Sequence, residues 1–282
     1  MTDADRFTFS AADGTTIAAR HWPAAGETRT VLIVAHGMGE HSGRYREPLA
    51  PLAARGVAIY APDHRGHGAT APEGTHGDLG PGGFAALVDD LAVLTRHAAA
   101  EHPDAVVVLL GHSMGSFAAQ AFAPIHADLI DGLALSGSAA LEALALTGPA
   151  SLEAFNAPFE PARTPFDWLS RDAGEVDRYI ADPWCGFSVD AAGQASMIAF
   201  APQMMDAATL PKDLPVYMVS GLADPLAMAI EPLIARYREA GLVVTTDLYP
   251  DARHEVFNET NRAEVVERFA AWLGTVRRRT RP

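Results

Sequence analysis

Cysteine is almost absent from this chain of 282 residues, in which Cys185 is the single one. A single cysteine excludes an intrachain disulfide, so the cysteine content does not indicate an oxidising compartment. The first ten residues, MTDADRFTFS, carry two acidic side chains and lack the apolar segment of a secretory signal. No uncharged apolar run approaches the roughly 20 residues of a membrane-spanning helix. These absences predict a cytoplasmic protein.

Positive charge is also scarce. The chain has 21 Lys and Arg against 35 Asp and Glu, which gives a formal net charge of -14. Because a phosphate backbone is bound by clustered cations, this balance argues against nucleic acid as a partner. The one basic run, VRRRTRP at 276–282, ends a predicted helix, where cations interact favourably with the helix dipole. Solvation is its expected role, and transient contact with an anionic membrane surface is the alternative. The oligomeric state is left open.

Short apolar runs alternate with longer helical patterns along most of the chain. This alternation is typical of βαβ units, so we predict an α/β fold with a mostly parallel sheet and helices on both faces. An antiparallel hairpin is predicted around the turn ADG near the start. The other strands are predicted at 30–37, 57–63, 105–111, 130–138, 215–221 and 242–250. The helices are predicted at 44–56, 84–102, 114–127, 227–239 and 262–278.

One long segment, residues 140–210, breaks this alternation. It contains helical fragments, prolines and large apolar side chains in place of strands. An insertion of this length is usually a cap or lid, because structureless loops of this size are rare in compact domains. We therefore predict a core domain formed by 1–139 and 211–282, with 140–210 as the cap. The alternative is a second packing layer whose aromatic residues fill only its own core.

The stretch VLLGHSMGSFAAQ, at 108–120, places Ser113 between two glycines where a predicted strand becomes a helix. In this context the G-x-S-x-G pattern is typical of a nucleophile elbow, in which the serine adopts strained backbone angles. The helix that follows offers free backbone N–H groups and a positive dipole to an oxyanion. The pattern predicts Ser113 as a nucleophile. The alternative is a glycine-rich turn that only brings the helix close to the sheet.

A serine nucleophile needs a general base and an acid that orients the base. Of the eleven His, His254 lies on a short loop after the last predicted strand, at the carboxyl edge of the sheet. Asp224 follows another strand end, with Pro225 fixing its turn. Asp251 is nearer in sequence, but so short a loop places it poorly to accept from Nδ1 while Nε2 faces Ser113. We therefore predict Asp224 as the acid, in the chain order Ser, Asp, His.

The pattern of the other histidines does not predict a metal site. His64 and His67 share a polar, glycine-rich loop, and their spacing also occurs in metal sites. No carboxylate or thiol cluster joins them, so we expect neither a metal nor a cofactor.

Two backbone N–H groups are expected to bind the oxyanion. Met114 follows the predicted nucleophile, and Met38 lies in HGMGEHSGRY, the loop after the strand at 30–37. Glycines 37 and 39 allow the backbone to approach a substrate closely. The loop lacks the G-x-G-x-x-G pattern and a Lys-Ser/Thr ending, which argues against a phosphate-binding loop.

Five segments together resemble the α/β-hydrolase superfamily, and they are HGMGEHSGRY, DHRGHGAT, GHSMGS, SGLADP and ARHE. More narrowly, they resemble its monoacylglycerol lipase and lysophospholipase branch, and the resemblance covers nearly the whole chain. The resemblance implies an α/β-hydrolase fold with a helical cap. It also implies that Ser113 is the nucleophile, His254 the base and Asp224 the orienting acid. The backbone N–H groups of Met38 and Met114 would then bind the oxyanion. Ser116 departs from the family pattern, which often has glycine there, so a slight change in helix–sheet spacing is expected.

These residues predict a serine hydrolase that cleaves carboxylic esters with apolar acyl chains, such as a monoacylglycerol or related lipid ester. Candidate acyl-binding residues in the apolar segment are Phe155, Phe159, Trp184 and Met204. One alternative is a serine aminopeptidase resembling the proline iminopeptidases, in which cap carboxylates would hold the substrate amine. A lysophospholipase and a catalytically silent ligand-binding protein are the others. Cys185 is expected to be a buried spectator.

Overall fold

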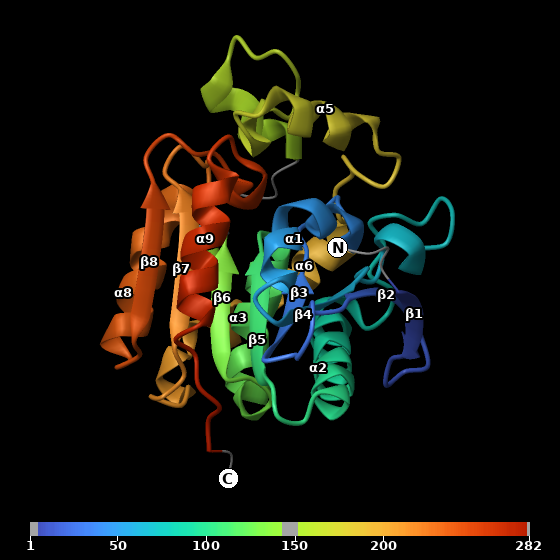
Figure 1. The fold of residues 1–282 in the computed structure, drawn as a ribbon. Helices are drawn as coiled ribbons and strands as arrows, with labels where there is room; N and C mark the ends of the chain where they lie inside the picture. The colour runs from blue at the N-terminus through green and yellow to red at the C-terminus, as the bar shows by residue number, and fades with distance from the viewer. Residues whose placement is uncertain (1–4, 143–151, 281–282) are drawn as a thin grey trace.

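The computed structural model describes residues 5–142 and 152–280, which form an eight-stranded sheet covered by helices (Figure 1). The strand order is β1-β2-β4-β3-β5-β6-β7-β8. The first two strands form the predicted antiparallel hairpin, β2 pairs antiparallel with β4, and all later neighbours pair in parallel. The strands are β1 (Asp5–Ser10), β2 (Thr16–Trp22), β3 (Thr30–Ala35), β4 (Val57–Pro62), β5 (Val106–His112), β6 (Gly132–Ser136), β7 (Val216–Gly221) and β8 (Val244–Tyr249).

The central strands are buried along their whole length. Every residue of β3, β4, β6 and β7 is buried, as expected for parallel strands covered on both faces. Their carboxyl ends lie together along the upper edge of the sheet in Figure 1. Side chains in the middle of such a sheet are out of reach of a substrate, so the accessible chemistry of this domain lies in the loops at that edge.

Helices cover both faces of the sheet, as predicted. Residues of α2 (Gly83–Glu101), α3 (Met114–His126) and α8 (Ile230–Glu239) pack into the hydrophobic cluster on one face. Those of α1 (Arg46–Ala53) and α9 (Arg262–Leu273) pack into the cluster on the other. Within the described residues, no helix combines the length and apolar character that crossing a membrane requires.

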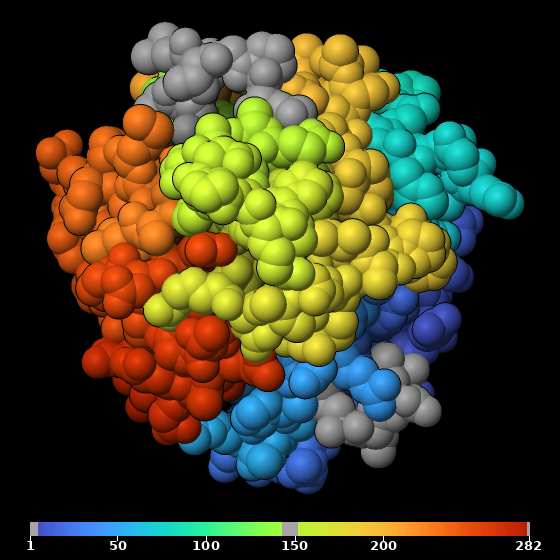
Figure 2. Space-filling model, turned by 90° about the horizontal axis from the view of Figure 1, so that it is seen from above, coloured from blue at the N-terminus to red at the C-terminus, as the bar shows by residue number. Residues whose placement is uncertain are grey.

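The first part of the predicted cap lies above the carboxyl edge of the sheet (Figures 1 and 2). It contains the 3₁₀ turns Leu152–Phe159 and Asp167–Leu169 and the helix α5 (Ala173–Ala181). Asp172 caps α5 by accepting hydrogen bonds from two backbone N–H groups of the first turn. The segment has a small hydrophobic cluster of its own, formed by Leu152, Phe166, Trp168, Leu169, Val176 and Tyr179.

The later part of the predicted cap packs on the core helices. The helices α6 (Ala191–Ala199) and α7 (Ala201–Met205) follow the segment above the sheet. The Phe200 ring lies edge-on to Phe84 of α2, with ring centroids 5.8 Å apart, and Ser196 Oγ accepts a hydrogen bond from the Phe84 N–H. The predicted insertion therefore includes a part above the sheet edge and a part beside the core. Its treatment as one cap domain stays a prediction, and residues 143–151 lie outside the described residues.

Candidate active site

Ser113 occupies the sharp turn between β5, which ends at His112, and α3, which begins at Met114. Its φ of 52° and ψ of −121° make it the one non-glycine residue with positive φ in the described part of the chain. Such a conformation is strained for an L-amino acid and persists only where the surrounding structure enforces it. Its N–H donates to Ser136 O at 3.0 Å, and its own carbonyl accepts from the Ser116 N–H at 2.8 Å. The side chain is half-buried, so a substrate can reach it.

The two glycines around Ser113 are required by close backbone contacts. A Cβ at Gly111 would lie 2.3 Å from Gly115 O, and a Cβ at Gly115 would lie 2.1 Å from Ala35 O. Any side chain at either position would therefore push α3 away from β5 or β3. The short side chain of Ser116 is accommodated here, and its hydroxyl donates to Ser113 O.

His254 and Asp224 meet at the carboxyl edge of the sheet. His254 Nδ1 lies 2.8 Å from Asp224 Oδ2, and both side chains are buried. The loops that carry them touch, because the Ala223 N–H donates to Ala252 O at 3.0 Å. The other Asp224 oxygen accepts from the Leu226 N–H at 2.9 Å, which fixes the carboxylate. Asp251, the rival acid in the sequence, is exposed.

The titration of His254 reflects two opposing influences. Burial favours the neutral imidazole, whereas Asp224 favours the protonated form through its charge and its hydrogen bond. The carboxylates outweigh burial, so the pKa of His254 is raised above its usual value. A base with this balance accepts a proton readily and is stabilised as the imidazolium.

Ser113 and His254 lie on adjoining loops. A Cβ at Gly137 would be 3.0 Å from Cε1 of both His112 and His254, and the two imidazole centroids are 4.8 Å apart. Among the described residues, however, Ser113 Oγ and His254 Nε2 make no hydrogen bond. Nucleophile–base hydrogen bonds are often loose without substrate and tighten in the reacting complex.

The loop after β3 lies beside Ser113. A Cβ at Gly37 would be 3.1 Å from Ser113 Cβ, which puts the backbone around Met38 next to the elbow. Within the described residues, the N–H groups of Met38 and Met114 have no hydrogen-bond acceptor. Two unpaired donors on either side of a serine are what a developing oxyanion needs.

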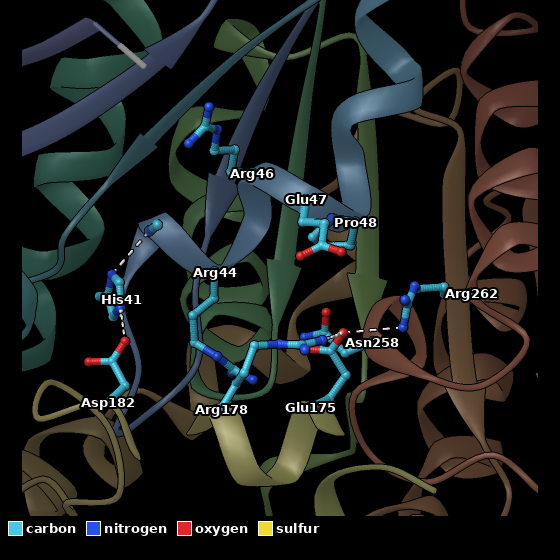
Figure 3. Close-up of a pocket in the computed structure, with 11 residues that line it drawn as sticks. His41, Arg44, Arg46, Glu47, Pro48, Glu175, Arg178, Asp182, Asn258 and Arg262 are labelled. Atoms are coloured by element: carbon cyan, nitrogen blue, oxygen red, sulfur yellow. Dashed lines mark hydrogen bonds and ion pairs between the residues drawn. The ribbon is translucent and has the colours of Figure 1, made fainter. Parts of the chain in front are cut away.

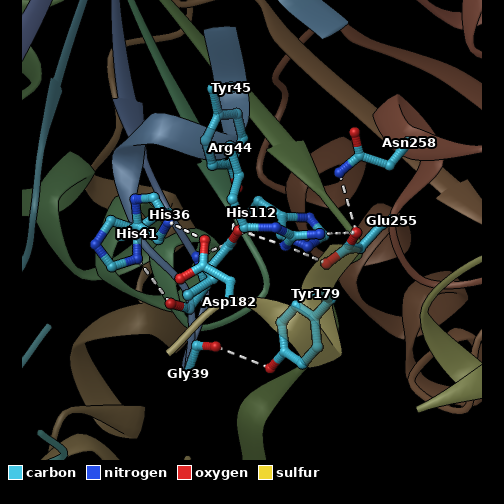
Figure 4. Close-up of polar contacts among 12 residues, drawn as sticks. His36, Gly39, His41, Arg44, Tyr45, His112, Tyr179, Asp182, Glu255 and Asn258 are labelled. Atoms are coloured by element: carbon cyan, nitrogen blue, oxygen red, sulfur yellow. Dashed lines mark hydrogen bonds and ion pairs between the residues drawn. The ribbon is translucent and has the colours of Figure 1, made fainter. Parts of the chain in front are cut away.

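Side chains from two other segments and from the loop itself hold the loop backbone, and Figure 4 shows the contact between Tyr179 and Gly39. Gly39 O accepts from the Tyr179 hydroxyl of the cap at 2.8 Å, and the Gly39 N–H donates to His67 Nε2 at 3.3 Å. The Gly37 N–H donates to Glu40 Oε1 at 2.6 Å. Burial lowers the pKa of His67 to about 4, so the imidazole is neutral near pH 7 and can accept this hydrogen bond. The loop at 64–67, expected to be polar, is therefore a buried support for the site.

A buried ion-pair network lies behind the same loop (Figure 4). Arg44 donates to both oxygens of Glu255, at 2.6 and 2.7 Å, and to Glu40 at 2.8 Å. Tyr45 and Asn258 donate to the same two carboxylates. Burial opposes ionisation of Glu255, but the Arg44 guanidinium outweighs it and lowers the pKa of that carboxyl to about 2. The sequence analysis missed this network, although the Glu40–Arg44 spacing of four residues was a signal for it.

The four predicted acyl-binding residues lie in different surroundings. Phe155 packs on Trp168, with centroids 5.0 Å apart, and Trp168 in turn packs on His254. Phe159 lies under the Arg253 guanidinium, 4.5 Å from it. Trp184 packs edge-on to His41, and Met204 is buried in the cluster of α2 and α3. The structure thus brings Phe159 to Arg253 of the His254 loop directly, and Phe155 to His254 through Trp168.

A charged cavity of about 260 Å³ lies between α1, helix α5 of the predicted cap and the start of α9 (Figure 3). His41 and Asp182 line it, and their side chains hydrogen-bond at 3.0 Å. Within the described part of the chain, these two and Cys185 are the one group whose possible metal-ligand atoms all lie within 4.8 Å of each other. His41 Nδ1 accepts from the Gly43 N–H, so Nε2 carries the proton that Asp182 accepts. With Nε2 protonated and burial raising the pKa of the Cys185 thiol, this arrangement suits a hydrogen-bonded pair better than a metal.

A strained serine elbow, two unpaired N–H donors and a buried His–Asp pair at the carboxyl edge of this sheet define an α/β-hydrolase with a serine nucleophile motif. The family model described as "Serine aminopeptidase, S33" matches residues 26–261, and the chain belongs to this family.

Relatives cover nearly the full length of the chain. A monoacylglycerol lipase of Mycolicibacterium smegmatis is 30% identical over 94% of this chain and 95% of its own. The monoglyceride lipase of Rattus norvegicus is 29% identical, over 88% of this chain and 82% of its own. A thermostable carboxyl esterase from Bacillus coagulans, solved with glycerol, superposes with a TM-score of 0.85 at 26% identity and covers 98% of this chain and 99% of that one. The α/β-hydrolase fold and the serine hydrolase class predicted from the sequence are confirmed.

Proposed function

We propose that this enzyme hydrolyses monoacylglycerols or closely related lipid esters with apolar acyl chains, using Ser113 as the nucleophile. The reaction class is carboxylic ester hydrolysis, as in the relatives named above. The observation that carries the proposal is the buried His254–Asp224 pair at 2.8 Å on a loop adjoining the strained Ser113 elbow. A strained residue beside a buried base supports a catalytic role, because such strain clusters at functional sites.

The chemistry follows from the geometry. Ser113 Oγ attacks the ester carbonyl, and His254 Nε2 takes the hydroxyl proton while Asp224 stabilises the imidazolium through Nδ1. The backbone N–H groups of Met38 and Met114 donate to the carbonyl oxygen as it gains negative charge. His254 then gives the proton to the departing alcohol, which leaves an acyl-enzyme. Water, deprotonated by the same imidazole, attacks the acyl carbon, and the imidazolium returns the proton to Ser113 Oγ as the bond to the acyl group breaks and the acid leaves.

The cap supports an apolar acyl group. The half-buried Phe155 ring, one ring away from His254 through Trp168, belongs to the apolar cluster above the sheet edge. Apolar walls with a few convergent polar groups are typical of sites for small apolar ligands. Phe155 is the acyl-contact residue that we propose, followed by Phe159; Trp184 and Met204 have weaker support because of where they pack.

The aminopeptidase alternative requires cap carboxylates to hold a substrate amine. The sequence offers Glu142, Glu153, Glu160, Asp167 and Glu175. Glu142 pairs with Arg236, and Glu175 pairs with two arginines, so these charges are already neutralised. Asp167 accepts from the Arg163 N–H at 2.6 Å, while Glu153 and Glu160 are exposed. Ester hydrolysis is therefore the better-supported reaction.

The composition of the chain also supports proposals for its cellular location and for its contact with lipid. The single cysteine supports a cytoplasmic location. The basic residues near the C-terminus are the proposed contact with a lipid surface, on a chain whose formal net charge is -14.

A substrate series tests this proposal. Initial rates would be measured for monoacylglycerols of increasing chain length, p-nitrophenyl acyl esters, a lysophosphatidylcholine and aminoacyl amides, with Ser113→Ala as the control. We expect hydrolysis of the esters, a preference for uncharged monoacylglycerols, and a loss of several orders of magnitude in Ser113→Ala. Preferential cleavage of aminoacyl amides would overturn the substrate class, and near-normal ester turnover by Ser113→Ala would overturn the mechanism.

A further inference from the structure

The cap binds the backbone of the proposed catalytic loop directly. The His254 N–H donates to Trp168 O at 3.3 Å, and the Glu255 N–H donates to Leu169 O at 2.8 Å. The Arg253 side chain donates to Ser170 O, also in the cap, at 3.3 Å. Three successive residues of the loop are thus tied to the cap segment 168–170.

The Trp168 ring lies on the imidazole itself. Its centroid is 4.7 Å from that of His254, the two planes are inclined by 42°, and Trp168 is 2% exposed. His254 also contacts Asp224 at Nδ1 and lies beside His112. The indole is thus one of three side chains that pack directly against this imidazole.

The indole contributes through its ring rather than through its N–H group. Trp168 Nε1 is buried and has no hydrogen-bond partner in the described part of the chain. A buried donor without a partner costs about 1 to 3 kcal/mol, so the N–H group itself does not stabilise the fold. A phenyl ring at this position would keep an aromatic surface against His254 and remove the unpaired donor.

We propose that Trp168 is a positioning residue through which the cap holds the His254 imidazole in place and keeps water away from it. The inference rests on the proposed function, because it assigns Trp168 a role toward the base of that mechanism. It makes the segment 168–170 a fixed part of the active centre, docked on the base loop, although it belongs to the cap.

The pH dependence of the reaction reports this role. The charged and titratable groups near His254 are Asp224, which contacts it, Glu255 and Glu40, which favour its protonation through their charge, and His112, which is neutral near pH 7 because its pKa is lowered to about 4. Burial is the largest single influence on His254 and lowers its pKa. Removing the indole admits water and relieves that influence while Asp224 stays bound to Nδ1. The pKa of His254 should then rise further, and more base should be protonated at a given pH.

The experiment compares Trp168→Ala, the milder Trp168→Leu, and Trp168→Phe with the wild type. The matched control is Trp272→Ala, a tryptophan 6% exposed in α9 that stacks on Tyr217 at 5.1 Å, away from His254. For each variant, kcat/KM for a soluble p-nitrophenyl ester and the rate of fluorophosphonate labelling of Ser113 would be measured from about pH 5 to pH 9. Thermal unfolding would be recorded in parallel, and Trp168→Leu replaces Trp168→Ala if the latter does not fold.

We expect Trp168→Ala or Trp168→Leu to lower kcat/KM by about 10- to 100-fold near pH 7 and to move the acid limb of both profiles to higher pH. Trp168→Phe should keep the acid limb at its wild-type position. Trp272→Ala should lower the thermal stability and leave the acid limb unchanged. Wild-type rates and limbs in the Trp168 variants, with Ser113→Ala inactive, would overturn this inference and leave the proposed function standing. If Ser113→Ala itself retains activity, the proposed function fails instead.

Discussion

The hydrogen bond between His254 Nδ1 and Asp224 controls how the proposed base titrates. The bond is 2.8 Å long and buried, and Asp224 is the strongest influence that raises the pKa of His254. Burial acts in the opposite direction, and Glu255 and Glu40 add smaller contributions that raise the pKa, so the balance depends mainly on Asp224. Asp251, an exposed aspartate three residues before His254, is available as a control of the same residue type.

The first prediction concerns Asp224→Asn. Without the carboxylate, burial prevails and the pKa of His254 should fall below its usual value, so the acid limb of kcat/KM should move to lower pH. The limiting rate should fall by about 10³- to 10⁴-fold, because the imidazolium loses its counter-ion and the ring its orientation. A pH–rate profile with a soluble ester measures both effects. Asp251→Asn should match the wild type, and a larger loss in Asp251→Asn than in Asp224→Asn would refute the choice of acid.

At the scale of elements, the loop at 37–45 is held by the buried Glu40–Arg44–Glu255 network. Arg44 connects the loop that carries Met38 to the loop that carries His254. Replacing one partner of a buried ion pair is costly, since it leaves the other charge buried without compensation.

The second prediction is that Arg44→Met lowers the free energy of unfolding by about 3 to 5 kcal/mol, because Glu40 and Glu255 are left buried without a counter-ion. The control is Arg55→Met, which removes an exposed pair with Glu267 and should cost less than about 1 kcal/mol. Urea unfolding of both variants measures this difference. Equal effects in the two variants would contradict the importance of the network.

The network also contributes to stability in acid through Glu255. The pKa of Glu255 is lowered from 4.5 to about 2 in the folded protein. Its contribution to stability is therefore present above about pH 4.5 and is lost as the pH falls toward 2. In Arg44→Met this part of the acid dependence should be absent or reversed.

Local patterns allowed much of this architecture to be predicted. The strand–turn–helix around Ser113 follows from a thirteen-residue stretch, because the elbow depends on contacts between neighbouring elements. Periodicity likewise predicted the parallel strands and the helices between them. The predicted helix 44–56 begins instead as a 3₁₀ turn, Ser42–Tyr45, followed by α1.

Contacts between distant segments could not be predicted in this way. Trp168 was not predicted as a site residue. Its proposed role depends on its contact with His254, which lies 86 residues later in the chain. The sequence pattern around His67 predicted a polar loop, yet His67 is buried and supports Gly39. Trp184 and Met204 shared the apolar character of Phe155, but composition does not tell which face of a segment meets the substrate.

For the whole molecule, net charge governs the encounter with a lipid surface. A chain of formal charge -14 is repelled by anionic membranes. At physiological ionic strength, salt screens this repulsion at distances beyond the Debye length of about 8 Å. The repulsion does not apply to uncharged micelles or vesicles.

The third prediction is that a monoacylglycerol is hydrolysed more slowly in vesicles that contain an anionic lipid than in zwitterionic vesicles. Added salt should reduce the difference, because it screens the repulsion. Initial rates at two ionic strengths, with a soluble ester as the control for salt effects on the chemistry, measure this. Faster turnover on anionic vesicles would indicate instead that the basic C-terminal residues dominate the encounter.

The central claim is that Ser113 is the nucleophile activated by His254, and fluorophosphonate labelling followed by peptide mass spectrometry tests it most directly. The account predicts one adduct per folded chain, on the peptide that contains Ser113, formed more slowly in His254→Ala and blocked by a monoacylglycerol. An unlabelled Ser113 in the folded, ester-hydrolysing protein, or a principal adduct on another residue, would contradict it.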